Sequence, residues 1–169
     1  IGGMLGNQLV FKQDKAGRTI VSVKPTFDEN RTFSDAQQAQ QEAFREAVAY
    51  ARTAKDEPVY EQKAEGTTKS AYNIAMADWF HEPEILEIDL SGWHGQAGQT
   101  IRIKAQDDVK VTQVTVAITG ADDALLESGN AVQSEGLWWE YTSTAAAQEG
   151  AKVMVSARDL PGHIAKMTQ

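Results

Sequence analysis

The sequence predicts an α+β protein in which a β-hairpin and helices precede an antiparallel β-sandwich. Helical periodicity is confined to the first half, whereas the second half consists of short alternating runs separated by Gly and Asp. The charge balance changes near Pro83, because residues 1–83 carry 10 Lys/Arg and 12 Asp/Glu while residues 84–169 carry 6 and 12. Proline also disfavours helix at the residue before it. We therefore predict a hairpin and helical region at 1–83 and a sandwich domain at 84–169.

Composition excludes several classes of protein. The 169 residues are 41% hydrophobic and carry a net charge of −8, which opposes binding to nucleic acid and to anionic membrane surfaces. No apolar run reaches the roughly 20 residues of a membrane-spanning helix. Cysteine is absent, so disulfides and thiolate metal sites are excluded. Because the chain opens on Ile1 and not on methionine, we expect a start that has been processed or trimmed, together with any targeting signal.

The N-terminal region begins with a predicted hairpin. Residues 9–11 and 19–23 are rich in β-branched and apolar side chains, and Gly17 in the connection can adopt positive φ. An isolated two-stranded hairpin is marginally stable, so this one must pack on something or pair with something.

Three helices follow the hairpin. Ser34 and Gln37 form a capping-box pattern that begins the first of them. Pro58 suits the first turn of a second helix, and residues 68–81 suit a third. The first helix carries a small-residue stripe at spacings of three and four, which predicts either an intramolecular helix pair or a subunit interface. Its members are Ala36, Ala39, Ala43, Ala47, Ala51 and Ala54, joined by Phe44 and Val48.

The C-terminal half predicts about seven short strands with clean alternation, which indicates an antiparallel sandwich. In "GLWWEYTST", neighbouring side chains point to opposite faces of the strand. Trp139 and Tyr141 are predicted to face the core together with Leu137. Trp138 then faces outward, where it packs under the helical half, contacts another subunit, or lies partly exposed over neighbouring side chains.

Parts of the chain resemble known groups of proteins. The stretches "AQDDVKVTQVTVAI", "LLESGNA", "GLWWEYTST" and "GAKVMVSARDLPGHIAK" resemble a bacterial immunoglobulin-like domain, with Trp139 and Tyr141 matching its W-x-Y strand and Asp159 and Gly162 its closing motif. His163 stands where that family usually has asparagine. The stretch "LGNQLVFKQDKAGRTIVSVKPT" with the Gln-rich helix is similar to uncharacterised bacterial and phage-associated proteins. The first resemblance implies a fold, and the second favours a component of a particle or assembly.

The sequence contains no motif that predicts catalysis. His81, His94 and His163 lack metal-ligand spacing, and no nucleophile elbow, P-loop or dinucleotide fingerprint is present. We therefore expect no enzyme activity, no cofactor and no metal. The acidic residues at strand ends allow three interpretations: turn capping, calcium binding by converging loops, or paired catalytic carboxylates, for which the sequence shows no partner acid or pocket. These residues are Asp107, Asp108, Asp122, Asp123 and Asp159.

Self-assembly is the function that these observations favour. We predict a non-enzymatic structural subunit of a filament or particle surface, with copies of itself as partners and an extracellular or particle-surface location. The expected contacts are Leu5, Leu9 and Phe11 of the N-terminal arm, together with the Ala-rich helix and Trp138. The alternative is an immunoglobulin-like adhesion or carbohydrate-binding module for a cell-surface or glycan ligand, in which Trp93 and Trp138 form an exposed platform.

Overall fold

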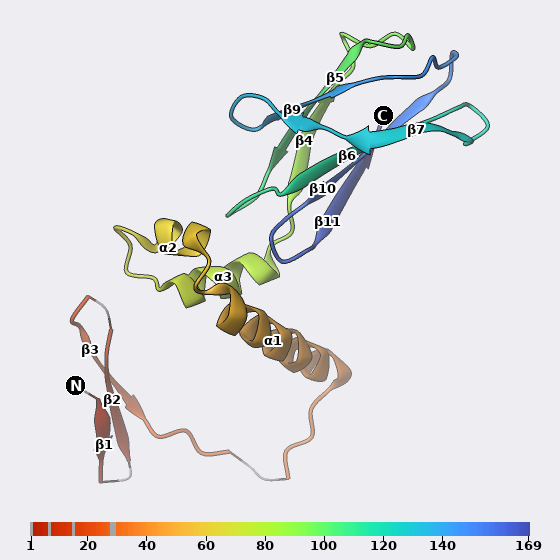
Figure 1. Ribbon diagram of the computed structural model, residues 1–169. Coiled ribbons are helices and arrows are strands. Elements are labelled where there is room, and N and C mark those ends of the chain that lie inside the picture. The colour runs from red at the N-terminus through yellow and green to blue at the C-terminus, as the bar shows by residue number, and fades with distance from the viewer. Residues whose placement is uncertain (1, 7, 15, 28–29) are drawn as a thin grey trace. The chain divides into compact units, whose positions relative to one another are not determined.

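The computed structural model describes residues 2–6, 8–14, 16–27 and 30–169, and the chain divides into two compact units, Ile1–Met76 and Ala77–Gln169 (Figure 1). The described residues form three helices and three antiparallel sheets, so the protein is α+β as predicted. The predicted boundary at Pro83 lies inside the second unit. The last residues of α3 (Ala71–Phe80) belong to that unit, where the Trp79 ring packs edge-on against His163 at 5.6 Å between ring centroids.

A three-stranded sheet opens the first unit. Its strands β1 (Gly3–Leu5), β2 (Leu9–Gln13) and β3 (Thr19–Val23) pair in the order β1-β2-β3. Strands β2 and β3 are those of the predicted hairpin, and Gly17 adopts a φ of 79° in the turn between them. Strand β1 was not expected, because glycine has low strand propensity and the surrounding glycines indicate a loop.

Two helices follow in this unit, α1 (Asp35–Ala54) and α2 (Pro58–Ala64), before the first residues of α3. Helix α1 begins with the predicted capping box, in which Ser34 Oγ accepts from the Gln37 N–H at 3.3 Å and the Gln37 side chain accepts from the Ser34 N–H at 3.1 Å. The alanine stripe is buried only towards the end of the helix, at Ala47, Ala51 and Ala54.

An aromatic pair joins α1 to α2. The ring of Tyr60 is completely buried and meets Tyr50 edge-on, with 6.4 Å between ring centroids and a hydrogen bond between the two hydroxyls. The intramolecular interpretation of the alanine stripe therefore holds for the last turns of α1. The first turns of the stripe are exposed.

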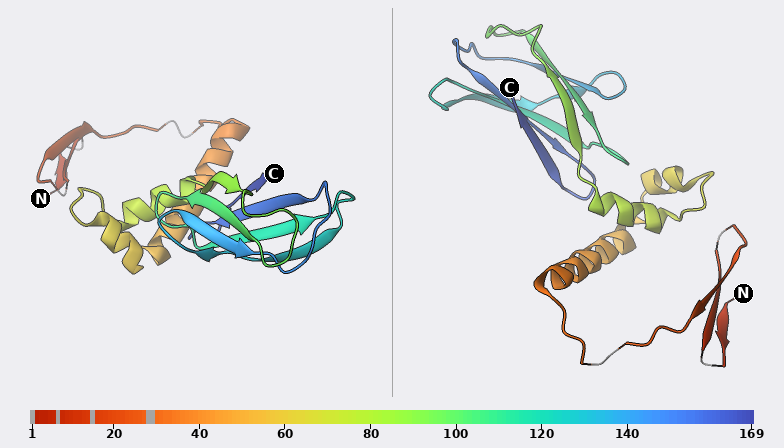
Figure 2. Two further views of the ribbon diagram at one scale, coloured as in Figure 1. Left: turned by 90° about the horizontal axis from the view of Figure 1, so that it is seen from above. Right: turned by 180° about the vertical axis from the view of Figure 1, so that it is seen from behind.

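The second unit is built mainly from two four-stranded antiparallel sheets (Figure 2). One has the order β4-β5-β9-β8 and the other the order β11-β10-β6-β7. All predicted strands are present, with these bounds: β4 (Glu84–Asp89), β5 (Thr100–Gln106), β6 (Gln113–Thr119), β7 (Leu125–Asn130), β8 (Val132–Gln133), β9 (Trp138–Thr142), β10 (Lys152–Arg158) and β11 (Ile164–Thr168).

The inner faces of both sheets supply one hydrophobic core, as in a β-sandwich. Alternate residues of the central strands are fully buried, among them Ile101 and Ile103 of β5, Val116 of β6, and Val153 and Val155 of β10. The chain passes from one sheet to the other at Ala131, whose N–H donates to the Val114 carbonyl at 2.8 Å while the next residue begins β8.

The double tryptophan divides between the two faces of β9. Trp139 and Tyr141 are each 7% exposed and belong to the core, as predicted. Leu137 is 43% exposed, so its predicted place in the core is wrong. The alternation argument fails there because β9 begins at Trp138, and the turn before the strand does not follow the period of two.

Among the described residues, no helix combines the length and the apolar character needed to cross a membrane.

Candidate functional site

The N-terminal sheet has one apolar face. The register places Leu5 of β1 opposite Leu9 of β2, and Leu9 opposite Val23 of β3. Phe11 lies opposite Val21, two residues further along, and therefore on the same face. We call these five residues the apolar face. The three apolar contacts predicted for the arm, Leu5, Leu9 and Phe11, thus share one surface, a grouping that the linear sequence did not reveal.

The apolar face has no cover among the described residues of the first unit. Leu5 is 64% exposed, Val21 52% and Val23 74%, whereas Leu9 and Phe11 are half-buried. Gly3 lies opposite Phe11 and a Cβ added there would meet nothing within 4 Å, which leaves a hollow of about 530 Å³ bordered by Leu5 and Phe11. A sheet face of this kind normally packs against another layer.

The opposite face of the same sheet is mixed in character. Met4 and Val10 share it with Lys12, Ile20 and Ser22. The basic side chain and the hydroxyl make this face compatible with water. Three of these five side chains, Met4, Val10 and Ile20, are apolar. The two faces therefore differ in degree, by the Lys12 and Ser22 side chains that this face carries.

A salt bridge closes the β2–β3 turn. The Arg18 guanidinium lies 2.7 Å from an Asp14 carboxylate oxygen, and the Arg18 N–H donates to the same side chain at 2.9 Å. The backbone N–H and then the side chain of Arg18 hold the pKa of Asp14 below its ordinary value. The pair is exposed, so it fixes the turn more than it stabilises the fold.

Trp138 lies on the outward face of the β4-β5-β9-β8 sheet, covered by cations. The Arg102 guanidinium lies 4.5 Å from the centre of a Trp138 ring and the Lys104 ammonium 5.7 Å. Both cations come from β5, where Lys104 is the cross-strand neighbour of Trp138, and Arg102 also lies 3.6 Å from the Glu140 carboxylate. Three surroundings were predicted for Trp138: the helical half, another subunit, or neighbouring side chains of its own sheet. The structure shows the third of these. With these cations beside it, the Trp138 side chain is half-buried.

Trp93 is a core residue. It is only 9% exposed and belongs to the sandwich core, so its predicted role in an exposed platform is wrong. Trp93 follows the loop after β4, and its N–H donates to the Leu90 carbonyl at 2.9 Å, which turns the chain so that the ring enters the sandwich. A glycine-rich loop is a poor guide to the direction of its one large side chain, because turn geometry decides that direction.

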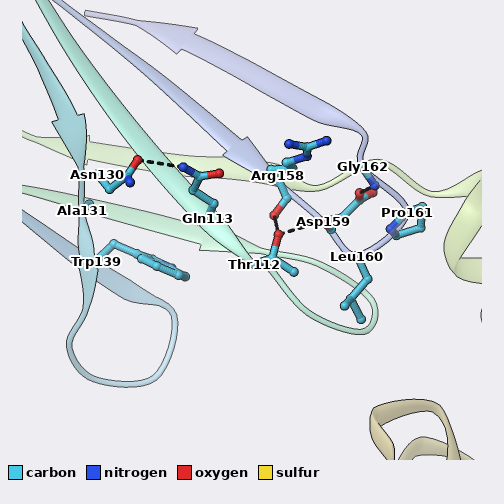
Figure 3. A pocket seen from close by; sticks show the side chains of 10 residues that line it. All are labelled: Thr112, Gln113, Asn130, Ala131, Trp139, Arg158, Asp159, Leu160, Pro161 and Gly162. Carbon is cyan, nitrogen blue, oxygen red and sulfur yellow. Dashed lines mark hydrogen bonds between the residues drawn. The ribbon is translucent and has the colours of Figure 1, made fainter. Parts of the chain in front are cut away.

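A polar depression of about 510 Å³ lies at one end of the sandwich (Figure 3). The Gln113 amide donates to the Asn130 side chain at 2.8 Å, and the Thr112 hydroxyl lies 3.0 Å and 2.9 Å from the Arg158 and Asp159 carbonyls. These polar groups already satisfy one another. The Arg158 guanidinium also lines the depression and takes no part in these bonds.

Asp159 anchors the loop at this end of the sandwich. Its side chain is buried, and one carboxylate oxygen accepts from the Gly162 and His163 N–H groups, both at 2.6 Å. The other oxygen lies 2.9 Å from His163 Nδ1. His163 lies four residues after Asp159 and belongs to the same turn. The matched closing motif has a structural role here.

The other strand-end aspartates cap turns or form ion pairs. Asp107 accepts from the N–H groups of the two residues after Asp108, and Asp122 accepts from the Ala124 N–H. Asp108 pairs with His81, and Asp123 with Lys152 at 2.7 Å. Within the described ranges, no three His, Cys, Asp or Glu side chains lie close enough together to hold a metal ion. The contacts observed are those expected of turn-capping residues.

Sequence reasoning missed Glu127, which points into the sandwich from the edge strand β7. One of its carboxylate oxygens accepts from the Thr144 hydroxyl at 2.6 Å, the Thr144 N–H at 2.8 Å and the Tyr141 hydroxyl at 3.2 Å. Because β7 belongs to one sheet and Tyr141 to the other, this carboxylate joins the two sheets. Gly129 makes room for the arrangement, since a Cβ there would lie 2.9 Å from the Tyr141 ring. The alternation of β7 places residue 127 on the inner face, but its charge suggested solvent.

Hydrogen bonding decides the protonation of Glu127. Burial acts to raise its pKa, but the hydrogen bonds from Thr144, Tyr141 and Ala145 outweigh it and leave the pKa below its ordinary value of 4.5. Burial and the Glu127 carboxylate raise the pKa of Tyr141. The pair is therefore a phenol that donates to a carboxylate at neutral pH.

Glu127 is expected to make the stability of the sandwich depend on pH. Replacing Glu127 by Gln is expected to lower the free energy of unfolding by about 1–2 kcal/mol at pH 7. A carboxyl whose pKa is lowered by folding stabilises the protein above its unfolded pKa and loses that contribution as pH falls through the folded value. The difference between wild type and Glu127→Gln should therefore shrink below about pH 4.5.

The measurement is urea unfolding at a series of pH values from 7 to 3. The matched control is Glu140→Gln, at an exposed carboxylate paired with Arg102, which should cost less than about 1 kcal/mol. A Glu127→Gln deficit that stays constant down to pH 3 would contradict the hydrogen-bonding account.

No family model matches the chain, and no curated protein matches it. Among solved structures it is similar to CopC from Methylosinus trichosporium OB3b, at 13% identity and a TM-score of 0.40, over 52% of this chain and 88% of that one. An engineered protein is similar at 16% identity and a TM-score of 0.37, over 59% of this chain and 26% of that one. A conjugative transposon lipoprotein from Bacteroides eggerthii DSM 20697 is similar at 14% identity and a TM-score of 0.29, over 53% of this chain and 93% of that one. Similarity at these low TM-scores assigns neither a family nor an activity to the chain.

Proposed function

We propose that this protein is a non-enzymatic structural subunit that assembles with copies of itself in a filament or on a particle surface. The observation that carries the proposal is the uncovered apolar face of the N-terminal sheet, formed by Leu5, Leu9, Phe11, Val21 and Val23. In this sheet no described residue from 2 to 23 is buried, so the sheet has no core of its own. Removing its apolar face from water in an assembly supplies the missing core.

The energy available from this face is comparable with what the association of subunits costs. Complete burial of one Val, Leu or Phe side chain contributes about 1.5–3 kcal/mol. Two copies together bring ten such side chains, of which Leu9 and Phe11 on each copy are already half-buried. The gain is therefore of the same order as the roughly 4–15 kcal/mol that association costs in lost translational and rotational freedom. A three-stranded sheet that is marginal by itself thereby becomes stable in the assembly.

Helix α1 supplies a second surface for subunit contact. Its first turns carry Ala36 and Ala39 on the exposed part of the alanine stripe, and Phe44 is 52% exposed. Small side chains allow a neighbouring backbone to approach closely, and an aromatic ring adds area. This part of the predicted helix contact therefore remains a candidate interface, whereas the last turns of α1 are buried.

The second unit in this proposal is an immunoglobulin-like sandwich. Its strand orders, β4-β5-β9-β8 and β11-β10-β6-β7, correspond to the A-B-E-D and G-F-C arrangement of immunoglobulin-like domains, with β7 as an added edge strand. This order supports the resemblance found in the sequence. A domain of this kind serves as a rigid body of the subunit.

The adhesion or carbohydrate-binding alternative depends on exposed aromatic rings. The two rings that it requires are Trp93 and Trp138, and both have contacts within the sandwich domain. Trp93 lies in the core, and the Trp138 ring is covered by Arg102 and Lys104. A sugar that stacks on Trp138 would have to displace both cations. The assembly proposal needs no such rearrangement.

Light scattering coupled to size-exclusion chromatography tests the proposal on the full chain. We expect oligomers that dissociate on dilution, and we expect Leu5→Asp to weaken them at least about a hundredfold in Kd, because a charge would enter the apolar interface. Met4→Asp is the matched control. Met4 is 58% exposed, close to the 64% of Leu5, but it lies on the opposite face of the same strand.

Two results would contradict the proposal. A wild-type chain that remains monomeric at every concentration would exclude self-assembly. Equal effects of Leu5→Asp and Met4→Asp would show that the apolar face is not the contact. Circular dichroism of both variants checks that the rest of the chain remains folded.

A further inference from the structure

Strand β3 forms an open edge of the N-terminal sheet. The strand order is β1-β2-β3, and within the described ranges no strand pairs with β3 on the side away from β2. An edge strand presents unpaired N–H and C=O groups that can form hydrogen bonds with another strand. Natural proteins usually protect such edges with charged residues, prolines or bulges. The five residues of β3, "TIVSV", contain neither charge nor proline, and Lys24 and Pro25 follow only after the strand has ended.

The hydrogen bonds at the two ends of the hairpin show which backbone groups point to the open edge. The Asp14 N–H donates to the Arg18 carbonyl at 3.1 Å, and the Lys24 N–H donates to the Gln8 carbonyl at 2.7 Å. In an antiparallel pair, residues that bond to the partner alternate with residues that bond away from it. Even-numbered residues of β3 therefore bond to β2. The backbone groups of Thr19, Val21 and Val23 point away from the sheet.

The same three residues extend the apolar face. Val21 and Val23 are two of its five members, and Thr19 shares their side of the strand. Val21 and Val23 are β-branched, as are Thr19 and Ile20, and such residues favour pairing in a sheet. A strand added at this edge would thus gain both backbone hydrogen bonds and contact with the apolar face.

We propose that β3 pairs antiparallel with β3 of a second copy about a two-fold axis at Val21; this inference rests on the proposed self-assembly. Val21 then lies opposite Val21 of the second copy, and Thr19 opposite Val23. The two three-stranded sheets join into one continuous sheet of six strands, with both apolar faces on the same side. The interface is isologous, so it closes a pair of subunits, and other surfaces such as α1 would extend the assembly.

The register follows from the backbone. Pairing about Val21 places all three outward residues in hydrogen-bonded positions. A shift of one residue would oppose outward groups to groups already bonded to β2. A shift of two residues in one direction brings Pro25, which has no N–H, opposite Thr19, and in the other direction brings the turn residue Gly17 opposite Val23.

Charge opposes the pairing of two copies in this arrangement, and salt weakens that opposition. Pairing about Val21 brings Arg18 opposite Lys24 of the second copy at each end of the strand pair, and Arg18 is already neutralised by Asp14 at 2.7 Å. The remaining like-charge repulsion is exposed and falls with added salt. Edge pairing should therefore be unchanged or strengthened by salt. An alternative is that the basic segment around Arg18 and Lys24 docks on the acidic remainder of another copy. Opposite charges would hold that contact, so added salt would weaken it.

Single cysteines test the register, because the natural chain contains none. In Val21→Cys the two new thiols meet at the two-fold axis, where a hydrogen-bonded antiparallel pair places Cα atoms about 5.5 Å apart, within the range of a disulfide. The matched controls are Ile20→Cys and Val23→Cys, whose positions lie opposite Ser22 and Thr19 of the second copy. Under mild oxidation we expect Val21→Cys to form the disulfide-linked dimer at least about tenfold faster than either control, and reduction to reverse it.

The outcomes separate this inference from the proposed function. Cross-linking that is faster in a control than in Val21→Cys would overturn the register. Wild-type oligomers together with equal cross-linking rates in all three variants would overturn the β3 pairing and leave self-assembly through another surface. A chain that is monomeric by light scattering would overturn both. Oligomers that dissociate with increasing salt would indicate the charge-held docking and overturn the edge pairing.

Discussion

Replacing Trp139 by alanine is expected to lower the free energy of unfolding of the second unit by about 3–5 kcal/mol. The Trp139 side chain is 7% exposed and packs in the core shared by both sheets. Alanine removes the apolar contacts of the ring and leaves a cavity that the close-packed core fills only in part. Urea unfolding followed by far-ultraviolet circular dichroism gives the change.

Trp138→Ala is the matched control for this prediction. It makes the same chemical change one residue earlier in the same strand, on the outward face. Only the contacts of the ring with the two cations and with the sheet surface are lost, which contribute about 0.5–1 kcal/mol at exposed sites. Equal losses in the two variants would contradict the assignment of the two tryptophans to opposite faces.

Replacing Asp159 by alanine is expected to lower the free energy of unfolding of the second unit by about 2–4 kcal/mol. The buried carboxylate accepts from the Gly162 and His163 N–H groups at 2.6 Å and contacts His163 Nδ1 at 2.9 Å. Alanine leaves these donors without their acceptor in a loop that is half-buried. The loop connects β10 to β11, so its loss should also loosen the β11 edge of the sheet.

Asp108→Ala is the control for Asp159→Ala, because each aspartate pairs with a histidine. The side chains of Asp108 and His81 are 60% and 59% exposed, whereas the Asp159 side chain is fully buried. An exposed pair contributes about 0–1 kcal/mol. Thermal unfolding of both variants measures the contrast, and hydrogen exchange locates it. Fast exchange at Gly162 and His163 in the Asp159 variant is the expected signature, and unchanged exchange there would argue against an anchoring role.

The regular elements were readable from local patterns. The capping box at Ser34 and Gln37, proline at the first turn of α2 and the alternation in β5, β6 and β10 each act over a few residues, and each appears in the structure. Local sequence determines these features because they depend on backbone geometry and on which side of an element is apolar.

The sequence predicts the members of the apolar face only in part. Leu5, Leu9 and Phe11 were identified as apolar residues of an arm, but Val21 and Val23 were not grouped with them. That grouping depends on the pairing register of three strands, and register relates residues that are distant in sequence. The unexpected strand β1 has the same cause, since its glycine is compatible with a strand only when a partner strand is present.

The surroundings of single side chains were the least readable. Trp93 was expected to be exposed and lies in the core, Leu137 was expected in the core and is exposed, and Glu127 was overlooked although it joins the two sheets. The direction of the loop places Trp93 in the core, and the start of β9 at Trp138 leaves Leu137 exposed. A hydrogen bond between the two sheets holds Glu127 on the inner face. None of these follows from a local period.

By itself, the sequence determined the order of helices and strands, the α+β class, the absence of cysteine and the acidic character of the chain. Tertiary structure alone decided that five apolar side chains gather on one face of a coreless sheet, and that Thr19, Val21 and Val23 present their backbone groups at its edge. The physical reason is that period and capping are properties of neighbouring residues, whereas a face and an edge exist only after strands have paired.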